Sequence, residues 1–314
     1  MKLFGFIFIC ILLISIIAIL SAALHAYIIT FYMPKCKEDE PYKLPQGEQY
    51  ENELSNIKKW VEELLAMPCE EIRIKSHDGL KLYGRYYHTA DGAPVQIMFH
   101  GYRSSSNLDF CGGARFAMRM GHNVLLVDQR SHGKSEGHTT CFGILERHDC
   151  LNWVKYISNR FGADTKIILS GLSMGAVTVL MSATLDLPEN VVGIIADCPF
   201  SSPRDVIKKV CRDQNLPADF LFPFIKLGAL FYGHFRLEAC SAVEGASVSK
   251  KPILLFHGDD DRFVPCQMSV KVKEANPEMI HFEIVPGAGH GLCYLVGPKQ
   301  YETATERFLE KVLN

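Results

Sequence analysis

Short apolar runs recur along the chain from residue 70 onward, and they alternate with longer stretches in which apolar residues recur at helical spacing. Most of these runs are apolar throughout, as is typical of parallel strands in a sheet that is covered on both faces. We therefore expect one α/β domain at 70–314, built on a mostly parallel, doubly wound sheet of about eight strands. The predicted strands are Glu71–Lys75, Leu80–Tyr87, Val95–Phe99, Asn123–Val127, Lys166–Leu169, Val191–Ala196, Pro252–Phe256 and Ile280–Val285.

The connections between these strands predict how the sheet is built. Asp78-Gly79 separates the first two strands, and this dipeptide favours a tight hairpin turn, so the sheet should start with an antiparallel pair. Helical patterns at Ile144–Phe161 and Ala176–Leu185 lie between later strands, as crossover helices do in parallel sheets.

One connection is much longer than a crossover helix requires. Residues 201–250 lie between two predicted strands, and insertions of this length in compact domains usually form lids or binding surfaces. We expect a helical cap there. Its centre is rich in aromatic residues, and Phe222, Phe224 and Phe231 are candidates for contact with a hydrophobic part of a substrate. Alternatively, these rings pack the cap onto the body.

The N-terminal segment has a different pattern. Residues 3–33 contain no Asp, Glu, Lys or Arg. As a helix this segment would reach about 46 Å, more than the roughly 30 Å of a hydrocarbon core. We therefore predict a transmembrane anchor at 1–33, with Tyr27, Phe31 and Tyr32 at the interface. The alternative is a signal peptide cleaved near Ser21-Ala22-Ala23, which would make the domain secreted.

Residues 34–69 are expected to join the anchor to the domain. The first part is polar and contains prolines, as juxtamembrane linkers do, and apolar residues from Leu54 to Leu65 then recur at helical spacing. This amphipathic helix is expected to pack on the domain, although it could also lie on a membrane surface. Lysines flank both sides of the predicted span, so the charge pattern does not indicate which side carries the domain.

Composition excludes some classes of function. The net charge is −2 with acidic and basic residues interspersed, so no basic stripe for nucleic acid is present. The 11 cysteines have no framework spacing and are expected to be free thiols. His132 and His138 do not have the spacing of metal ligands. We expect no metal and no cofactor, and the sequence does not indicate an oligomeric state.

The strongest chemical signal is Gly171-Leu172-Ser173-Met174-Gly175, between a predicted strand and a predicted helix. In a nucleophile elbow, a serine occupies a sharp turn at such a junction, and flanking glycines avoid clashes with the neighbouring backbone. Ser173 is thus the candidate nucleophile. A serine hydroxyl needs a base to remove its proton and a third group to orient that base.

Candidates for both partners follow in the expected chain order. Asp261 lies in an acidic turn directly after the strand Pro252–Phe256, and His290 lies in a loop of small residues after the strand Ile280–Val285. Because the carboxyl ends of parallel strands meet at one edge of a sheet, Ser173, Asp261 and His290 should converge. We assign His290 as the general base and Asp261 as the acid that orients it.

These motifs together resemble the α/β-hydrolase superfamily, in particular small bacterial esterase-like and serine-aminopeptidase-like hydrolases. The matching segments are 99–102, 128–135, 171–175, 257–265 and 289–290. The resemblance implies an α/β-hydrolase fold with a cap, and an oxyanion hole formed by the backbone N–H groups of Tyr102 and Met174. Such preorganised amides stabilise the negative charge that develops on a carbonyl oxygen in the transition state.

One matching segment departs from the family pattern, because Ser131 stands where members often have glycine. The segment is expected to support the site structurally, with Asp128 and Arg130 as a buried ion pair.

The expected function is therefore that of a membrane-anchored serine hydrolase, most consistent with cleavage of a small to medium carboxylic ester that is partly hydrophobic. Its partners would be that small-molecule substrate and the lipid bilayer. A serine peptidase or aminopeptidase that cleaves amides is the nearest alternative. A catalytically silent binding protein with the same fold is an alternative from another class.

Overall fold

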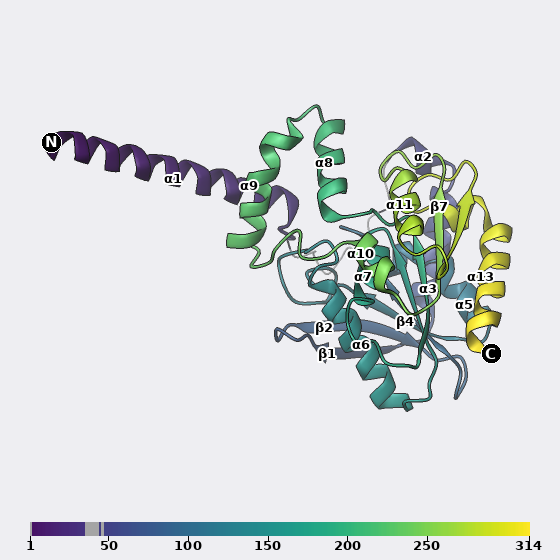
Figure 1. Cartoon of the computed structure of the whole chain (residues 1–314). Coiled ribbons are helices and arrows are strands. Elements are labelled where there is room, and N and C mark those ends of the chain that lie inside the picture. The colour runs from purple at the N-terminus through teal and green to yellow at the C-terminus, as the bar shows by residue number, and fades with distance from the viewer. Residues whose placement is uncertain (1, 35–43, 45–46) are drawn as a thin grey trace.

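The computed structural model describes residues 2–34, 44 and 47–314, and an eight-stranded sheet forms the centre of its body (Figure 1). The strand order is β1-β2-β4-β3-β5-β6-β7-β8. β1 and β2 pair antiparallel, β2 pairs antiparallel with β4, and the remaining pairs are parallel. The strands are β1 Glu70–Lys75, β2 Lys81–Tyr87, β3 Val95–Phe99, β4 Asn123–Asp128, β5 Ile167–Leu172, β6 Val191–Asp197, β7 Ile253–Gly258 and β8 Ile280–Val285. The predicted mostly parallel sheet is confirmed.

Helices cover both faces of this sheet. Neighbouring residues of β3 show why its apolar run is continuous: Ile97 and Phe99 join one buried cluster, whereas Met98 joins another on the opposite face. The first face carries α6 Glu146–Phe161, α7 Met174–Ser182, α10 Ala242–Val248 and α11 Gln267–Ala275; the second carries α5 Gly113–Arg119 and α13 Pro298–Leu313. Both faces are thereby removed from water, as the uninterrupted hydrophobicity of the strands predicted.

The connection between β6 and β7 contains helices α8, α9 and α10. α8 spans Pro203–Asp213 and α9 spans Ala218–Phe231, and the two stand apart from the sheet beside α1 (Figure 1). α8 begins where the Ser202 hydroxyl accepts a hydrogen bond from the Asp205 N–H and Pro203 occupies the first turn, which is a favourable start for a helix. α10 instead packs against α7 and α11 of the body.

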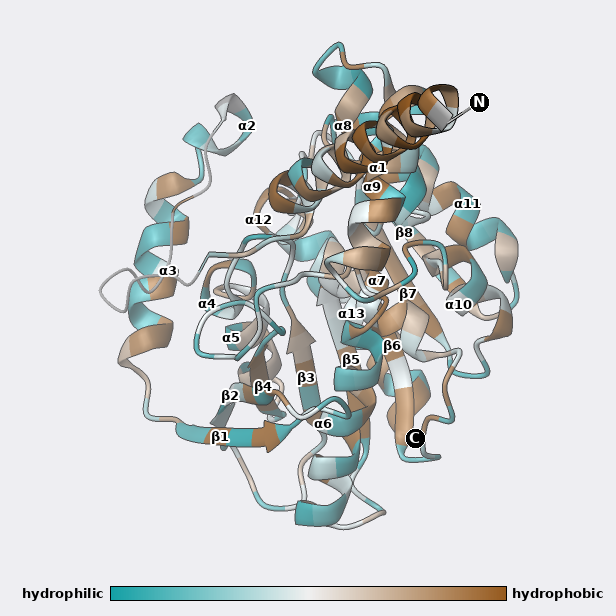
Figure 2. Cartoon of the chain, turned by 90° about the vertical axis from the view of Figure 1, so that its left-hand side faces the viewer, coloured by the Kyte–Doolittle hydropathy of each residue, from teal (hydrophilic) through white to brown (hydrophobic). Residues whose placement is uncertain are grey.

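The N-terminal helix α1, Lys2–Thr30, has the length and composition of a membrane span or a signal sequence, with a mean hydropathy of 3.2. Figure 2 shows that it is hydrophobic along nearly its whole length. Its first two thirds are exposed, whereas its last turns pack on the body. Tyr27 and Phe31 were expected at a lipid interface, but both are buried in protein, where Phe31 contacts the rings of Phe142 and Phe235.

Four further helices complete the described chain. They are α2 Glu48–Glu51, α3 Leu54–Ala66, α4 Ser106–Asp109 and α12 Cys293–Val296. The amphipathic α3 buries Ile57, Val61 and Leu64 against the body. Most of the predicted linker, namely residues 35–43 and 45–46, lies outside the described residues.

Candidate active site

Ser173 lies in the turn between β5 and α7, at the carboxyl edge of the sheet. Its backbone has φ 54° and ψ −114°, a conformation that is strained for a residue with a side chain. A Cβ on Gly171 would overlap the carbonyl group of Gly175, and a Cβ on Gly175 would overlap the carbonyl oxygen of Phe99. The flanking glycines thus permit the turn, and the turn is that of a nucleophile elbow.

Asp261 follows β7 and is held by its own loop. Its Oδ1 accepts hydrogen bonds from the N–H groups of Phe263 (2.9 Å) and Val264 (2.7 Å). Burial alone would raise the pKa of this carboxyl, but hydrogen bonds from His257 and His290 outweigh that effect and hold the pKa below its ordinary value. Asp261 is therefore a carboxylate at neutral pH, with Oδ2 directed at the imidazole of His290.

His290 connects the carboxylate to the serine. Its Nδ1 lies 2.7 Å from Asp261 Oδ2, and its Nε2 lies 2.9 Å from Ser173 Oγ. Because an ionised carboxylate can only accept, Nδ1 must carry the proton in this arrangement, which leaves Nε2 free to accept from the Ser173 hydroxyl. The three side chains singled out in the sequence thus form one continuous hydrogen-bond chain.

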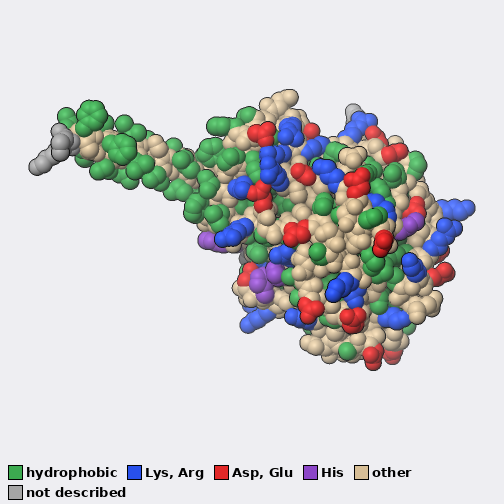
Figure 3. Space-filling model, viewed as in Figure 1, with side chains coloured by type: hydrophobic (Ala, Val, Ile, Leu, Met, Phe, Trp, Pro, Cys, Tyr) green, Lys and Arg blue, Asp and Glu red, His purple; other side chains and the backbone are tan. Residues whose placement is uncertain are grey.

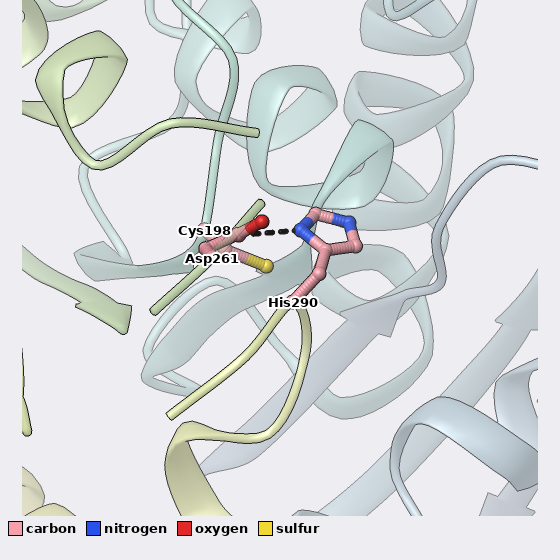
Figure 4. A group of neighbouring side chains, drawn as sticks. All are labelled: Cys198, Asp261 and His290. Carbon is pink, nitrogen blue, oxygen red and sulfur yellow. Dashed lines mark hydrogen bonds and ion pairs between the residues drawn. The ribbon is translucent and has the colours of Figure 1, made fainter. Parts of the chain in front are cut away.

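A cysteine that the sequence did not single out lies beside this chain. Figure 4 shows Cys198 next to Asp261 and His290, and candidate ligand atoms of the three lie within 4.8 Å of one another. Burial raises the pKa of the Cys198 thiol well above its usual range, so the thiol stays neutral. With Asp261 and His290 already bonded to each other, we interpret the group as a hydrogen-bond chain with an apolar neighbour, not as a metal site.

His257 is a second residue that sequence reasoning missed. Its Nε2 donates to the Val264 carbonyl oxygen over 2.8 Å, and its Nδ1 accepts from the Ser269 hydroxyl over 2.6 Å. The same Nε2 lies 3.2 Å from Asp261 Oδ2. His257 and His290 therefore both approach the same carboxylate oxygen of Asp261. A fully buried polar residue at the end of the apolar strand β7 was the available signal.

The loop after β3 passes directly beside Ser173. On one side of Tyr102, the Gly101 N–H donates to Asp109 Oδ2; on the other side, the Arg103 N–H donates to His132 Nε2. Within the described residues, the Tyr102 N–H between them donates to no group, and neither does the Met174 N–H at the start of α7. Two predicted donors thus remain available near the serine.

The two buried histidines of this loop region are structural. Burial lowers the pKa of His132 to about 3, so its imidazole is neutral and can accept from the Arg103 N–H. The fully buried His100 accepts from the Gln129 N–H over 3.1 Å. These bonds tie the loop after β3 to the loop after β4.

The predicted ion pair between Asp128 and Arg130 is wrong. Arg130 is buried, but its guanidinium binds Asp149 Oδ2 at 2.6 Å and Asp78 Oδ2 at 2.9 Å. Asp128 instead accepts from the Ser106 hydroxyl and the Lys134 N–H, and so closes its own loop. β4 ends at Asp128 and the chain turns at Arg130, so the two side chains leave the sheet edge toward different partners.

A pocket of about 420 Å³ lies over Ser173 and His290. Aliphatic and aromatic side chains make up most of its wall, which suits a ligand with apolar parts. The wall comes from the loops after β3, β5 and β8 and from the segment that contains α2 and α3; it includes Leu44, Tyr50, Ile57, Leu108, Phe110, Leu172, Phe263, Leu292, Leu295, Tyr294 and Tyr301.

Asp197, the last residue of β6, is a buried carboxyl in the wall of this pocket. Within the described residues its Oδ1 has no hydrogen-bond partner, and burial raises its pKa to about 6. Its backbone carbonyl accepts from the Ser173 N–H over 2.8 Å. The predicted strand ended one residue earlier, at Ala196, and Asp197 was not singled out, although an acid directly after a buried strand was a usable signal.

The aromatic residues expected to contact the substrate lie elsewhere. Phe222, Phe224 and Phe231 are on α9, and none of them is among the residues that line the pocket. Phe222 is buried beneath α8, whereas Phe231 is 52% exposed. The pocket wall on that side comes instead from the segment that follows the N-terminal helix.

Comparisons with known proteins agree with this architecture. Residues 94–210 match the family model described as alpha/beta hydrolase fold. The chain is 28% identical to the uncharacterized protein YqkD of Bacillus subtilis over 196 residues, which is 62% of this chain and just under two thirds (64%) of that relative. It is 24% identical to the uncharacterized protein Rv2307c of Mycobacterium tuberculosis over 245 residues, 76% of this chain and 78% of the relative.

Among solved structures, the esterase Pf2001 of Pyrococcus furiosus superposes with a TM-score of 0.65 at 24% identity, over 80% of this chain and 94% of that one. Similarity at this level of identity establishes the fold alone. With the elbow, the strand order and the family match in agreement, the chain has the α/β-hydrolase fold, and the resemblance to that superfamily expected from its motifs is confirmed.

Proposed function

We propose that this protein is a membrane-anchored serine hydrolase that cleaves carboxylic esters. The observation that carries the proposal is the hydrogen-bond chain from Asp261 through His290 to Ser173, at a pocket of about 420 Å³. A serine hydroxyl becomes a useful nucleophile when an oriented imidazole can take its proton, and the hydrogen bonds that His290 makes to Asp261 and Ser173 support this role.

In this mechanism Ser173 Oγ attacks the ester carbonyl carbon while His290 Nε2 accepts the hydroxyl proton. His290 then returns the proton to the departing alkoxide, which leaves an acyl group on Ser173. Water, deprotonated by the same imidazole, releases the acid and restores the serine. Asp261 keeps the proton on Nδ1 and stabilises the imidazolium that forms in each half-reaction.

The developing oxyanion would be held by the N–H groups of Tyr102 and Met174. Both are free to donate, while the neighbouring N–H groups of Gly101 and Arg103 are committed to Asp109 and His132. By analogy with measured hydrolases, each such donor contributes about 3 to 4 kcal/mol of transition-state stabilisation.

An ester substrate is favoured over an amide for two reasons. An alkoxide leaves with less assistance than an amine, so the simple arrangement found here suffices. In addition, Pf2001, which shares the fold, is described as an esterase. The mostly apolar pocket wall suits an acyl or alkyl group of moderate size.

The membrane part of the proposal rests on how α1 packs. Ala23, which a signal peptidase would need to reach in an extended conformation, is fully buried in a helix against α9. The last turn of α1 also accepts hydrogen bonds from Tyr102 and Arg103. A segment so integrated into the body is better interpreted as a retained anchor than as a cleaved signal.

A fluorophosphonate probe tests the catalytic proposal, because it labels only an activated serine. We expect labelling of the full-length parent and none of Ser173→Ala, with hydrolysis of p-nitrophenyl esters lost in parallel. Ser158→Ala, at a serine on α6 far from the pocket, is the matched control. Equal labelling of parent and Ser173→Ala would refute the assignment. Faster cleavage of aminoacyl anilides than of esters would favour the peptidase alternative.

A further inference from the structure

Helix α9 has two apolar faces, and only one of them is covered. The face toward the body carries Phe222, Ile225 and Ala229, all buried. Phe220, Phe224, Leu227 and Phe231 follow at intervals of four, three and four residues, so they share the opposite side of the helix. Phe220 is 67% exposed and Phe231 is 52% exposed, whereas Phe224 and Leu227 between them are partly buried. We call this second face, which remains largely open to solvent, the outer face of α9.

The outer face lies beside the N-terminal helix. Gly228 allows close contact, since a Cβ there would lie 2.6 Å from the Ala23 carbonyl oxygen, and the Tyr232 hydroxyl donates to the Leu20 carbonyl oxygen over 3.1 Å. Both of these contacts lie in the C-terminal half of α9 or directly after it. In Figure 1 α9 lies across α1 at the point where α1 leaves the body.

The length of the exposed part of α1 indicates how deep in a bilayer the crossing of α1 and α9 would lie. Side chains from Leu3 to Leu20 are almost all exposed, and this stretch is about 27 Å long as a helix. A bilayer's hydrocarbon core is about 30 Å thick. If this stretch spans the core, Leu20 and the end of α9 lie at the boundary between the acyl chains and the headgroups.

The geometry points to a lipid surface as the partner of the outer face of α9. We propose that α9 is an interfacial helix whose Phe220, Phe224, Leu227 and Phe231 side chains enter the headgroup boundary beside the spanning helix. The outer face is opposite the α9 residues that pack on the body, and α9 lies across α1 where α1 leaves the body. Figure 3 shows hydrophobic side chains covering α1 and continuing onto the adjoining body. This proposal rests on the proposed anchoring by α1.

An interfacial position for α9 also defines the substrate more closely. Tyr102 and Arg103, which line the pocket, bond to the last turn of α1 only a few residues beyond Ala23. The pocket is therefore held near the membrane surface. An ester that partitions into the bilayer would reach it with a short transfer through water, so we infer a lipid-soluble ester as the substrate class.

Tryptophan quenching in lipid tests the position of α9. The full-length chain is reconstituted in phosphatidylcholine vesicles with or without bromine on the acyl chains, as parent, Phe231→Trp and Phe161→Trp. Phe161 is the matched control, since it is an exposed phenylalanine at the end of α6, away from α1. After subtraction of the parent signal, the tryptophan emission of Phe231→Trp should be lower in brominated than in unbrominated vesicles by roughly twofold or more. The emission of the control should be the same in both.

Each outcome has a distinct meaning. If the Phe231→Trp emission is unaffected by bromine, the interfacial proposal is wrong. If the tryptophan is in addition shielded from water, a second protein copy covers this face. Fluorophosphonate labelling of Ser173 in the same vesicles shows whether each variant is folded, and Phe220→Trp replaces Phe231→Trp if the latter is not labelled. A Phe231→Trp variant that is labelled but not quenched would refute the surface and leave the hydrolase proposal standing, whereas an unlabelled parent would refute the hydrolase proposal.

Discussion

The Tyr102 hydroxyl donates a hydrogen bond to the Thr30 carbonyl oxygen over 2.9 Å. Tyr102 belongs to the loop that passes beside Ser173, and Thr30 is the last residue of α1. The next residue, Arg103, adds a bond from its guanidinium to the Ile29 carbonyl oxygen over 3.0 Å. The end of the N-terminal helix and the candidate oxyanion loop are therefore one connected structure.

Tyr102→Phe removes the bond to Thr30 but keeps the backbone N–H. Since a typical hydrogen bond contributes about 1 kcal/mol, we expect kcat for a soluble ester to fall roughly fivefold, with little change in KM. Tyr156→Phe, at a tyrosine on α6, is the control. An unchanged kcat would show that this bond does not position the loop. Steady-state kinetics on the full-length chain measure both parameters.

Asp261→Asn removes the charge that orients His290. The amide can present its N–H to Nδ1 and so favour the wrong tautomer, and we expect kcat to fall by about 10⁴, as in the serine-protease case. Asp260→Asn changes a neighbouring acid whose side chain pairs with Arg262 near the surface, and should retain activity. A larger loss in the Asp260 variant than in the Asp261 variant would contradict the assignment.

Asp197→Asn tests the buried carboxyl in the pocket wall through the pH dependence of stability. Burial raises the pKa of Asp197 from 3.8 to about 6, so folding favours its protonated form. The stabilisation it confers is present below pH 3.8 and is lost as the pH rises through about 6. This loss, absent in the variant, amounts to at most about 3 kcal/mol.

The Tm difference between Asp197→Asn and the parent should therefore shift in favour of the variant between pH 4.5 and pH 8. Thermal unfolding in detergent measures it, with Asp186→Asn, at an exposed acid after α7, as the control. A difference that does not change with pH would mean that Asp197 titrates alike in the folded and unfolded chains.

Gly228→Val tests the packing of α1 on α9. A side chain at this position would press against the Ala23 carbonyl oxygen and Tyr27, and overpacking of this kind typically costs about 1 to 3 kcal/mol. We expect a lower Tm and faster proteolysis near residue 30. Leu230→Val, at an exposed neighbour, should behave as the parent. Equal stability of the two variants would mean that the helices separate freely.

Retention of the N-terminal helix can be checked by intact-mass measurement of the protein from the membrane fraction. Because Ala22 and Ala23 are packed into a helix against the body, we expect the mass of the chain with residues 1–23 present. A mass that corresponds to cleavage after Ala23, with the domain recovered in the soluble fraction, would show that the segment is a signal peptide.

Much of the fold could be predicted because strands buried on both faces have an unmistakable pattern. β3 and β8 have the predicted bounds. β5 begins one residue later than predicted and ends three residues later, at Leu172, because the prediction stopped where Ser170 and Gly171 interrupt the apolar run. The convergence of Ser173, Asp261 and His290 was also predictable, since parallel strands bring their carboxyl ends to one edge. That reasoning required only chain order and strand ends.

The walls of the pocket could not be predicted in the same way. Hydrophobic periodicity shows which side of a helix is buried but not what covers it, so Ile57 of α3 and Tyr50 of α2 were not connected to the pocket over Ser173, a residue more than 100 positions later. For the same reason, Tyr27 and Phe31 were assigned to a lipid interface when their partners are Phe142, Tyr232 and Phe235.

The close fit between Gly228 and Ala23 has a consequence for protein engineering and for evolution. A hydrophobic segment that only tethers a domain could be exchanged for another without harm. The N-terminal helix, in contrast, packs on the domain through the buried residues Ala23, Tyr27 and Phe31. A chimera with a foreign helix in this position would lack these contact residues, and the loop beside Ser173 would lose the matching end of α1 to which Tyr102 and Arg103 bond. We therefore expect the N-terminal helix and the domain to be inherited together.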